Sequence, residues 1–293
     1  RLRLLELATD ETVPAALERL RATGKYEYVE PNHLRHAATT AGDPLYSSGN
    51  QWALRNLGQN GGKAGADISA EEAWSIQTDA RAATVAIIDS GMRLTHEDLA
   101  PNLWVNPGET GSNRPGNGND DDGNGYIDDL NGINSLIARG TPGGGNPADA
   151  TGHGTAVASV IGAVGSNGRG MTGVAWTASL MPLRFLDALG LGLVSDVVEC
   201  IDYAIARRVK VINASFGSSS YSKTEYDAFK RAREAGIVVV CAAGNSGLNN
   251  DLSAHYPSGF LLDNIITVAN TTRTDALATS SDYSSGLTDL GAP

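Results

Sequence analysis

The sequence contains few cysteines, an excess of acidic over basic residues, and no long apolar run. It has 2 cysteines among 293 residues, too few for a disulfide framework. We therefore expect Cys200 and Cys241 to be buried as small apolar side chains. No apolar segment is long enough to cross a bilayer, so we expect no membrane span. The net charge of −11 argues against nucleic acid as the main partner.

Motifs of several enzyme classes are also missing. There is no His-Glu-x-x-His sequence, which disfavours a zinc protease, and no Gly-x-Ser-x-Gly turn of the α/β-hydrolases. A Gly-x-Gly-x-x-Gly string at 168–173 follows a predicted helix and precedes a strand. That order is the reverse of the dinucleotide-binding context, so we expect no nucleotide site.

Apolar runs alternate with helical patterns from residue 81 onward. The predicted strands are 84–88, 179–186, 209–214, 237–242 and 264–269, and the predicted helices are 153–164, 194–207 and 222–235. Strands that alternate with helices in this way predict an α/β fold with a doubly wound, mostly parallel sheet.

Three polar residues stand where such a fold carries function. Asp89 follows the buried strand 84–88, at the carboxyl end where α/β sheets place their sites. His153 begins a helix, and an imidazole moves protons near neutral pH. Asn245 lies in a glycine-bounded turn after strand 237–242, where its amide could donate to an oxyanion. Singly, each residue also has an ordinary structural explanation as a cap, a turn former or a packed histidine.

Together, these segments resemble the motifs of the subtilisin-like serine proteases, the subtilases. Asp89-Ser90-Gly91 resembles the motif of the catalytic aspartate, Gly152-His153-Gly154-Thr155 that of the catalytic histidine, and Ala242-Ala243-Gly244-Asn245 that of the oxyanion asparagine. The resemblance extends over roughly residues 45–293, with Asp before His as in subtilisin. It implies a serine endopeptidase that acts on polypeptide substrates and is secreted or otherwise extracytoplasmic.

The family's Gly-Thr-Ser-Met-Ala motif, which carries the nucleophile, does not occur in the sequence. Residues 289–293 resemble the stretch shortly before that serine. We therefore expect the nucleophile to lie beyond residue 293, and the fragment as given to be inactive. The alternative is a non-catalytic subtilase-fold protein that binds peptides or calcium, and the residue at the nucleophile position would distinguish the two. The retained Asp89, His153 and Asn245 favour the enzyme.

Two loops resemble the substrate-binding edges of the family. They comprise Leu189, Gly190, Leu191 and Gly192 before helix 194–207, and Ser215, Phe216 and Gly217 after strand 209–214. A peptide held in extended form between two such edges gains main-chain hydrogen bonds whatever its sequence. For each loop, the alternative is a plain connection.

A long insertion at 106–150 contains a spacing like that of an EF-hand calcium loop. The expected oxygen ligands are the side chains of Asp120, Asp122, Asn124 and Asp128, and the carbonyl of Tyr126. Asn131 occupies the usual closing position, so Asp129 is expected to close the site instead. A solvated acidic loop is the alternative, but clustered carboxylates repel one another unless a cation offsets them.

The resemblance implies a second calcium site. Its side-chain ligands would be Asp98 and Asn167, completed by carbonyls near Gly165, Arg169 and Met171. Calcium is therefore the one cofactor that we expect.

Residues 1–38 form a separate pattern of strand (2–7), helix (13–23) and strand (26–30), about half of a ferredoxin-like α+β unit. Residues 28–37 resemble the end of a subtilase inhibitor propeptide. We therefore expect residues 1–38 to be the C-terminal part of such a propeptide, cleaved near Ala38, with a permanent N-terminal subdomain as the alternative. Residues 39–80 would be a linker and N-terminal arm, and 81–293 an incomplete peptidase domain. The sequence begins at Arg1 without methionine, so the lack of a signal peptide is uninformative.

Overall fold

The structure is a computed structural model that describes residues 3–7, 10–31 and 39–293. The chain divides into two compact units, Arg1–Ala37 and Ala38–Pro293. Within the described residues, none of the helices has the length and apolar character needed to span a bilayer.

The described part of the first unit contains the helix α1 (Val13–Ala22), which confirms the prediction for 13–23. Thr12 caps its start by accepting a hydrogen bond from the Ala15 N–H at 3.4 Å. The strands predicted at 2–7 and 26–30 are wrong where they are described, because residues 3–7 and 26–30 have no strand structure. Two strands with one helix bury too little apolar surface to be stable alone, and Leu4 and Tyr28 are exposed. The predicted cleavage position and residues 32–38 lie outside the described part.

A seven-stranded sheet forms the centre of the second unit. Its strands are β1 (Asp79–Asp89), β2 (Ile133–Asn134), β3 (Thr177–Arg184), β4 (Val211–Ala214), β5 (Val238–Ala242), β6 (Ile265–Asn270) and β7 (Leu290–Ala292). They are ordered β2-β3-β1-β4-β5-β6-β7, and every neighbouring pair is parallel. The five predicted strands are confirmed. The very short β2 and β7 were not predicted, because so few residues show no periodicity.

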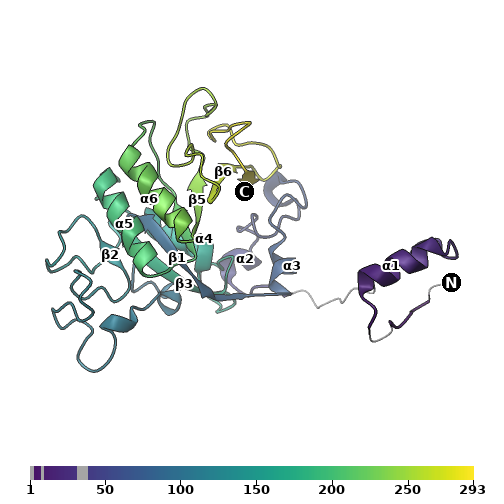
Figure 1. Cartoon of the computed structure of the whole chain (residues 1–293), viewed down its shortest axis with the longest axis horizontal. Coiled ribbons are helices and arrows are strands. Elements are labelled where there is room, and N and C mark those ends of the chain that lie inside the picture. Colours follow the sequence, from purple (N-terminus) through teal and green to yellow (C-terminus); the bar gives the residue numbers. More distant parts are fainter. Residues whose placement is uncertain (1–2, 8–9, 32–38) are drawn as a thin grey trace. The chain divides into compact units, whose positions relative to one another are not determined.

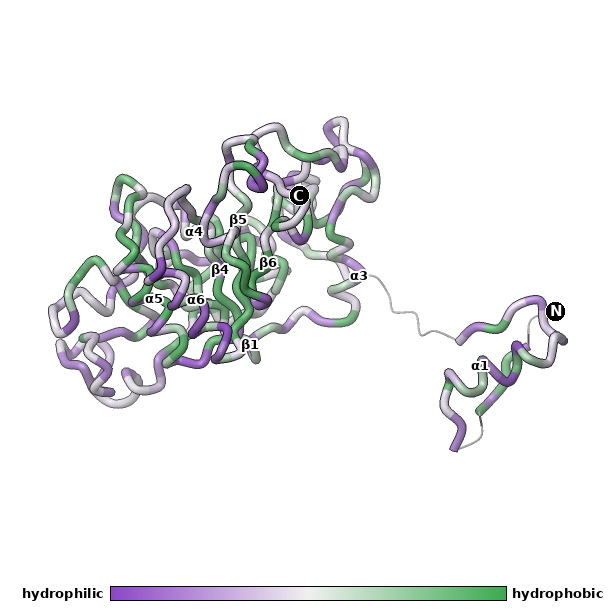
Figure 2. The backbone as a smooth tube through the Cα atoms, turned by 45° about the horizontal axis from the view of Figure 1, so that its top comes forward, coloured by the Kyte–Doolittle hydropathy of each residue, from purple (hydrophilic) through white to green (hydrophobic). Residues whose placement is uncertain are grey.

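Helices cover both faces of this sheet, as a doubly wound fold requires. The predicted long helices are confirmed as α4 (His153–Gly162), α5 (Val194–Ala206) and α6 (Lys223–Glu234). Helices α5 and α6 lie side by side over one face (Figure 1). They share a core with Ile88 and Ile212, whereas Ile87 and Leu180 pack with Ala158 of α4. The apolar colouring of the central strands in Figure 2 matches their burial between these layers. The predicted α/β fold class is therefore confirmed.

Both cysteines are buried and free, as expected. Burial raises the pKa of the Cys200 thiol to about 12 and also raises that of Cys241. Their positions inside the core keep them in the protonated, unreactive form.

Residues 41–74 are packed more tightly than the expected linker. They contain the short helices α2 (Pro44–Ser47), η1 (Gln59–Gly61) and α3 (Ala70–Trp74). Tyr46, Leu54 and Trp74 form a small core that Trp176 completes, and the Trp74 and Trp176 ring centroids are 5.2 Å apart. This segment is therefore an integral part of the second unit.

We expect Ile87→Ala and Ile88→Ala each to lower the free energy of unfolding by about 2–5 kcal/mol. The two neighbouring side chains point to opposite faces of β1, and both are fully buried. Denaturant unfolding of the variants would measure the effect. Ile76→Ala is the matched control, because Ile76 is 80% exposed, and it should change stability by less than about 0.5 kcal/mol. A large loss of stability in only one of the two core variants would contradict the burial of both sheet faces beneath helices.

Candidate active site

The residues predicted to act in catalysis lie at the carboxyl edge of the sheet. Strand β1 ends at Asp89 between β3 and β4, and β5 leads into the turn that carries Asn245. The Phe185 N–H, just beyond β3, donates to the Asp89 carbonyl at 2.9 Å. Parallel strands bring their carboxyl ends to the same edge, so residues far apart in the chain meet there.

Asp89 and His153 are in direct contact. The His153 Nδ1 lies 2.8 Å from Asp89 Oδ1 and 2.9 Å from Oδ2. Because a carboxylate can only accept, Nδ1 carries the proton in this arrangement and Nε2 is left as the acceptor. The Asp89 side chain is 1% exposed, whereas that of His153 is 53% exposed. The pair thus joins a buried anchor to an imidazole that solvent or a substrate can reach.

Glycines on both sides make this contact possible. A Cβ on Gly154 would lie 2.1 Å from the Gly91 carbonyl oxygen and 3.2 Å from the Asp89 carboxylate. Gly91 itself has φ +104°, and an added Cβ would lie 2.4 Å from the Pro147 carbonyl oxygen. Larger residues at either position would push the helix and the strand end apart.

Asp149 fixes the turn that enters α4, and the sequence reasoning missed it. Its Oδ1 accepts hydrogen bonds from the Gly152 N–H at 2.9 Å and from the Ser90 hydroxyl at 2.8 Å. Its Oδ2 accepts from the Thr155 hydroxyl and also from the Thr155 N–H, the latter at 2.9 Å. Burial opposes the charged form, but these hydrogen bonds outweigh it and lower the pKa of Asp149. The only sequence signal was an aspartate shortly before a helix, where such residues are common.

Asn245 lies exposed in the turn after β5. Pairing continues briefly beyond that strand, since the Ala243 N–H donates to the Val268 carbonyl at 2.9 Å. The turn therefore starts from a fixed point at the same sheet edge as Asp89.

The two predicted substrate-binding loops meet at this edge as well. The ring of Phe216, after β4, contacts Phe185, after β3, with centroids 4.7 Å apart. Phe185 also packs against Gly192, where an added Cβ would lie 2.4 Å from its ring. Ser215 follows β4 directly, and Gly217 approaches His255 so closely that a Cβ would lie 2.1 Å from the imidazole.

One detail of the first loop differs from the prediction. The Asp187 carboxylate accepts from the N–H groups of Leu189 at 2.8 Å and Leu191 at 3.0 Å. These two donors are therefore not free for a peptide, because they close the turn itself. The Gly190 N–H likewise donates to the Asp187 carbonyl at 3.1 Å, so Gly192 is the better candidate for main-chain donation to a peptide. The side chains of Leu189 and Leu191 are exposed.

The acidic insertion brings together a set of carboxylates that differs from the predicted ligand set. Carboxylate oxygens of Glu109, Asp122 and Asp129 lie within 4.8 Å of one another. Glu109 and Asp129 are fully buried, and Glu109 Oε2 has no hydrogen-bond partner among the described residues. Burial raises the pKa of both Glu109 and Asp129. Glu109 lies eleven or more positions before the acidic run, which is why the local spacing did not indicate it.

Other predicted ligands are used differently. Asp120 accepts from the Asn124 and Gly125 N–H groups at 3.1 and 2.8 Å, and Asp128 accepts from the Gly118 N–H at 2.9 Å. Both carboxylates lie outside the cluster, because short acidic side chains readily bond the amides of their own loop. The Asn124 amide donates to Asp129 at 2.8 Å. The Tyr126 side chain is buried and donates to Glu199.

The cluster retains the character of a cation site. Arg207 bonds Asp122 at 2.8 Å and Asp129 at 3.3 Å, so one guanidinium offsets only part of the charge of three carboxylates. The unpartnered oxygen of Glu109 and the all-oxygen donor set fit a hard cation such as calcium.

Two side chains predicted to bind a second calcium, Asp98 and Asn167, lie side by side, but the Asn167 Oδ1 already accepts from the Arg169 N–H at 2.8 Å. The Asn167 amide lies 2.7 Å from the Asp98 carboxylate, which is buried. Asp43, which the sequence reasoning missed, accepts from the N–H groups of Ser166 and Gly168 in the same loop, at 2.6 and 3.0 Å. Arg169 turns outward and pairs with Glu97 at 2.6 Å.

Comparison with known proteins gives one family. The Peptidase_S8 (subtilase family) model matches residues 80–293. The thermophilic serine proteinase of Bacillus sp. strain AK1 is 29% identical, over 96% of this chain and 58% of its own length. The extracellular protease of Xanthomonas campestris is 32% identical, over 99% and 48%. The cell wall-associated protease of Bacillus subtilis is 30% identical, over 98% and 28%.

Solved structures agree with these sequences. A protease structure from Pseudoalteromonas arctica is 30% identical, with a TM-score of 0.63 over 87% of this chain and 72% of that one. A cold-adapted subtilisin-like serine proteinase shares the fold, with a TM-score of 0.59 over 83% and 71% and with 22% identity. The chain spans at most 58% of the length of these curated relatives. With the family model matched over most of the sequence, the chain belongs to the subtilases, the subtilisin-like serine proteases.

Proposed function

We propose that the complete protein is a serine endopeptidase whose triad comprises Asp89, His153 and a serine that follows residue 293. The observation that carries this proposal is the contact of His153 Nδ1 with both oxygens of a buried carboxylate, at 2.8 and 2.9 Å. A histidine anchored in this way has the tautomer that a general base needs.

In the proposed reaction, His153 Nε2 takes the proton of the serine and returns it to the leaving amine. Asp89 stabilises the imidazolium that forms and does not itself become protonated. Asn245 donates to the oxyanion of the tetrahedral intermediate. Polypeptide substrates lie in extended form between the loops 189–192 and 215–217, with main-chain hydrogen bonds that depend little on sequence.

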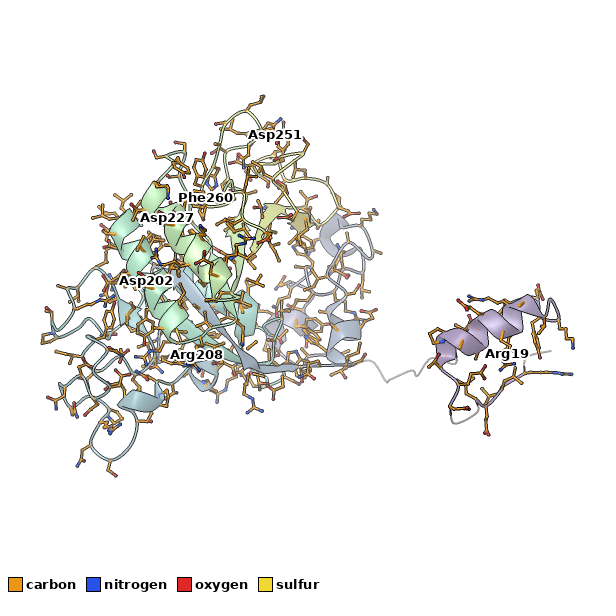
Figure 3. All side chains as sticks on the ribbon, viewed as in Figure 1. Arg19, Asp202, Arg208, Asp227, Asp251 and Phe260 are labelled. Carbon is orange, nitrogen blue, oxygen red and sulfur yellow. The ribbon has the colours of Figure 1, made fainter. Side chains whose placement is uncertain are left out.

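We expect Asp89→Asn to lower kcat of the complete protein by about 10⁴-fold, because the amide favours the wrong imidazole tautomer. His153→Ala should cost about 10⁶-fold. Asp202→Asn is the matched control on α5 (Figure 3), where the half-exposed Asp202 side chain pairs with Arg231 at 2.7 Å. It should change kcat by less than about twofold. Hydrolysis of a chromogenic peptide amide would measure all three.

The wild-type enzyme should also be inactivated by a serine-directed fluorophosphonate, and residues 1–293 alone should show no turnover. Full activity in His153→Ala would contradict the mechanism. A complete protein without hydrolytic activity, and without a serine at the nucleophile position, would favour the non-catalytic alternative.

We also propose that calcium binds at the cluster of Glu109, Asp122 and Asp129, and at the loop that joins Asp98 and Asn167. At the first place, two buried carboxylates lie beside a third, and their charge is only partly offset. At the second, the buried Asp98 carboxylate lies beside Asn167, and the resemblance to the family's calcium loop supports the proposal. Calcium would act there as a structural ion that ties the insertion to the sheet.

We expect calcium to raise the thermal stability of the chain. A ligand that binds only the folded state stabilises it by about 3 kcal/mol at a hundredfold excess over Kd. Glu109→Gln should reduce the difference between the Tm with calcium and the Tm with chelator. Asp121→Asn makes a similar charge change in the same loop but outside the cluster, so it should preserve that difference. An equal response in both variants would exclude the cluster, and an unchanged Tm in the wild type would exclude both sites.

Residues 1–38 are proposed to be part of an inhibitor propeptide, with the mature enzyme acting outside the cytoplasm. The resemblance of residues 28–37 to a propeptide end supports the first proposal, as does the division into two units. The names of two relatives, a cell wall-associated and an extracellular protease, support the second.

We expect the active enzyme to start between about residues 37 and 45, the interval being the usual uncertainty of a sequence boundary. N-terminal sequencing of active, full-length enzyme measures this directly. An active enzyme that retains Arg1–Ala37 would instead have a permanent N-terminal subdomain.

A further inference from the structure

Asp282 holds the turn that carries Asn245. It lies between β6 and β7, and its side chain is almost completely buried, with the residue 3% exposed. Its Oδ1 accepts hydrogen bonds from the Ser246 N–H at 2.8 Å and the Leu248 N–H at 2.9 Å. Its own N–H donates to the Gly244 carbonyl at 2.9 Å. Both peptide groups that flank Asn245 are therefore bonded to one residue.

The second carboxylate oxygen is also packed against the turn. A Cβ on Gly244, which has φ +120°, would lie 2.1 Å from Asp282 Oδ2. Around this contact, the Gly247 N–H donates to the Ser280 carbonyl and the Tyr283 N–H to the Leu248 carbonyl, each at 3.0 Å. The turn is thus fastened to residues 280–283 by main-chain bonds, with the carboxylate at the centre.

Burying a carboxylate is costly unless hydrogen bonds compensate it, and bonds from N–H groups to an ionised acceptor are strong and directional. An exposed turn without such an anchor would sample several backbone orientations. A donor to a developing oxyanion accelerates the reaction only when it is oriented in advance.

We propose that Asp282 is a positioning residue for the oxyanion site, fixing the turn 244–248 so that the Asn245 amide is oriented in advance of the reaction. This inference rests on the proposed function, because it requires Asn245 to be the oxyanion donor. Asp282 touches neither the substrate nor the reacting atoms and acts through Asn245.

The first test is a double-mutant cycle in the complete protein. Asp282→Ala should lower kcat by about 10–100-fold, the loss expected when a catalytic group is misplaced by about 1 Å. Its KM should stay within about threefold, because ground-state binding does not use this donor. In an Asn245→Ala background, the same substitution should cost less than about threefold more, since the group that it positions is gone.

Two control variants distinguish a loss of Asn245 positioning from a general loss of structure. Asp282→Asn keeps an acceptor in the same place and should retain kcat within about threefold of the wild type. Asp251→Ala removes another carboxylate from the same group of loops (Figure 3), one that accepts from the Ser285 N–H at 2.9 Å but does not bond the Asn245 turn. It should leave kcat unchanged. If Asp282→Ala does not fold, Asp282→Ser takes its place in the cycle, because its hydroxyl is too short to reach both N–H groups.

Amide hydrogen exchange in the 293-residue chain gives a second readout that needs no catalysis. The Ser246 and Leu248 amides should exchange at least about tenfold faster in Asp282→Ala than in the wild type or in Asp251→Ala. Unchanged exchange at both amides would overturn the proposal. So would an unchanged kcat in Asp282→Ala, or an equal loss with and without Asn245. Lack of hydrolysis by the wild-type complete protein would overturn the proposed function instead, and the exchange result would still decide whether Asp282 holds the turn.

Discussion

The hydrogen bond between the buried Asp89 carboxylate and the half-exposed His153 imidazole determines what the surrounding structure must provide. Asp89 is held at the end of the central strand β1 and accepts from His153 and from the Ser90 N–H at 2.6 Å. Burying a carboxylate in such a position is costly unless hydrogen bonds compensate it. The helix that carries His153 must also approach the strand closely, which Gly91 and Gly154 allow. The packing of α4 against Ile87 and Leu180 fixes that approach.

Other carboxylates hold backbone loops in place along the carboxyl edge of the sheet. Asp149 holds the turn into α4, Asp187 closes the loop at 187–191, and Asp282 holds the turn of Asn245. In each case, the acceptor bonds N–H groups of a loop that would otherwise be free to move. Such loops are the usual carriers of function on a rigid scaffold. As a result, the exposed side chains at the carboxyl edge of the sheet are attached to backbone that these hydrogen bonds hold in place.

The parts of this structure that the sequence predicted are those with a local signal. The runs around Ile87, Ile212 and Val239 are long and apolar, so the central strands and their order along the chain were clear. The family motifs indicated Asp89, His153 and Asn245. The N-terminal strands failed because strand formation depends on partners that a local pattern does not show. Glu109, Asp43 and Asp282 were missed for a related reason. Their contacts join segments that are distant in sequence, such as Asp43 with the loop at 166–168 and Asp282 with the turn at 244–248.

The most direct measurement of the central claim is the tautomer of His153. NMR of the 293-residue chain labelled with ¹⁵N-histidine, at a pH where the imidazole is neutral, distinguishes a protonated Nδ1 from a protonated Nε2. Contact with both oxygens of Asp89 requires the proton on Nδ1, and Asp89→Asn should shift the population towards Nε2. A wild-type His153 with the proton on Nε2 would contradict the account, because that imidazole could not accept a proton from a serine.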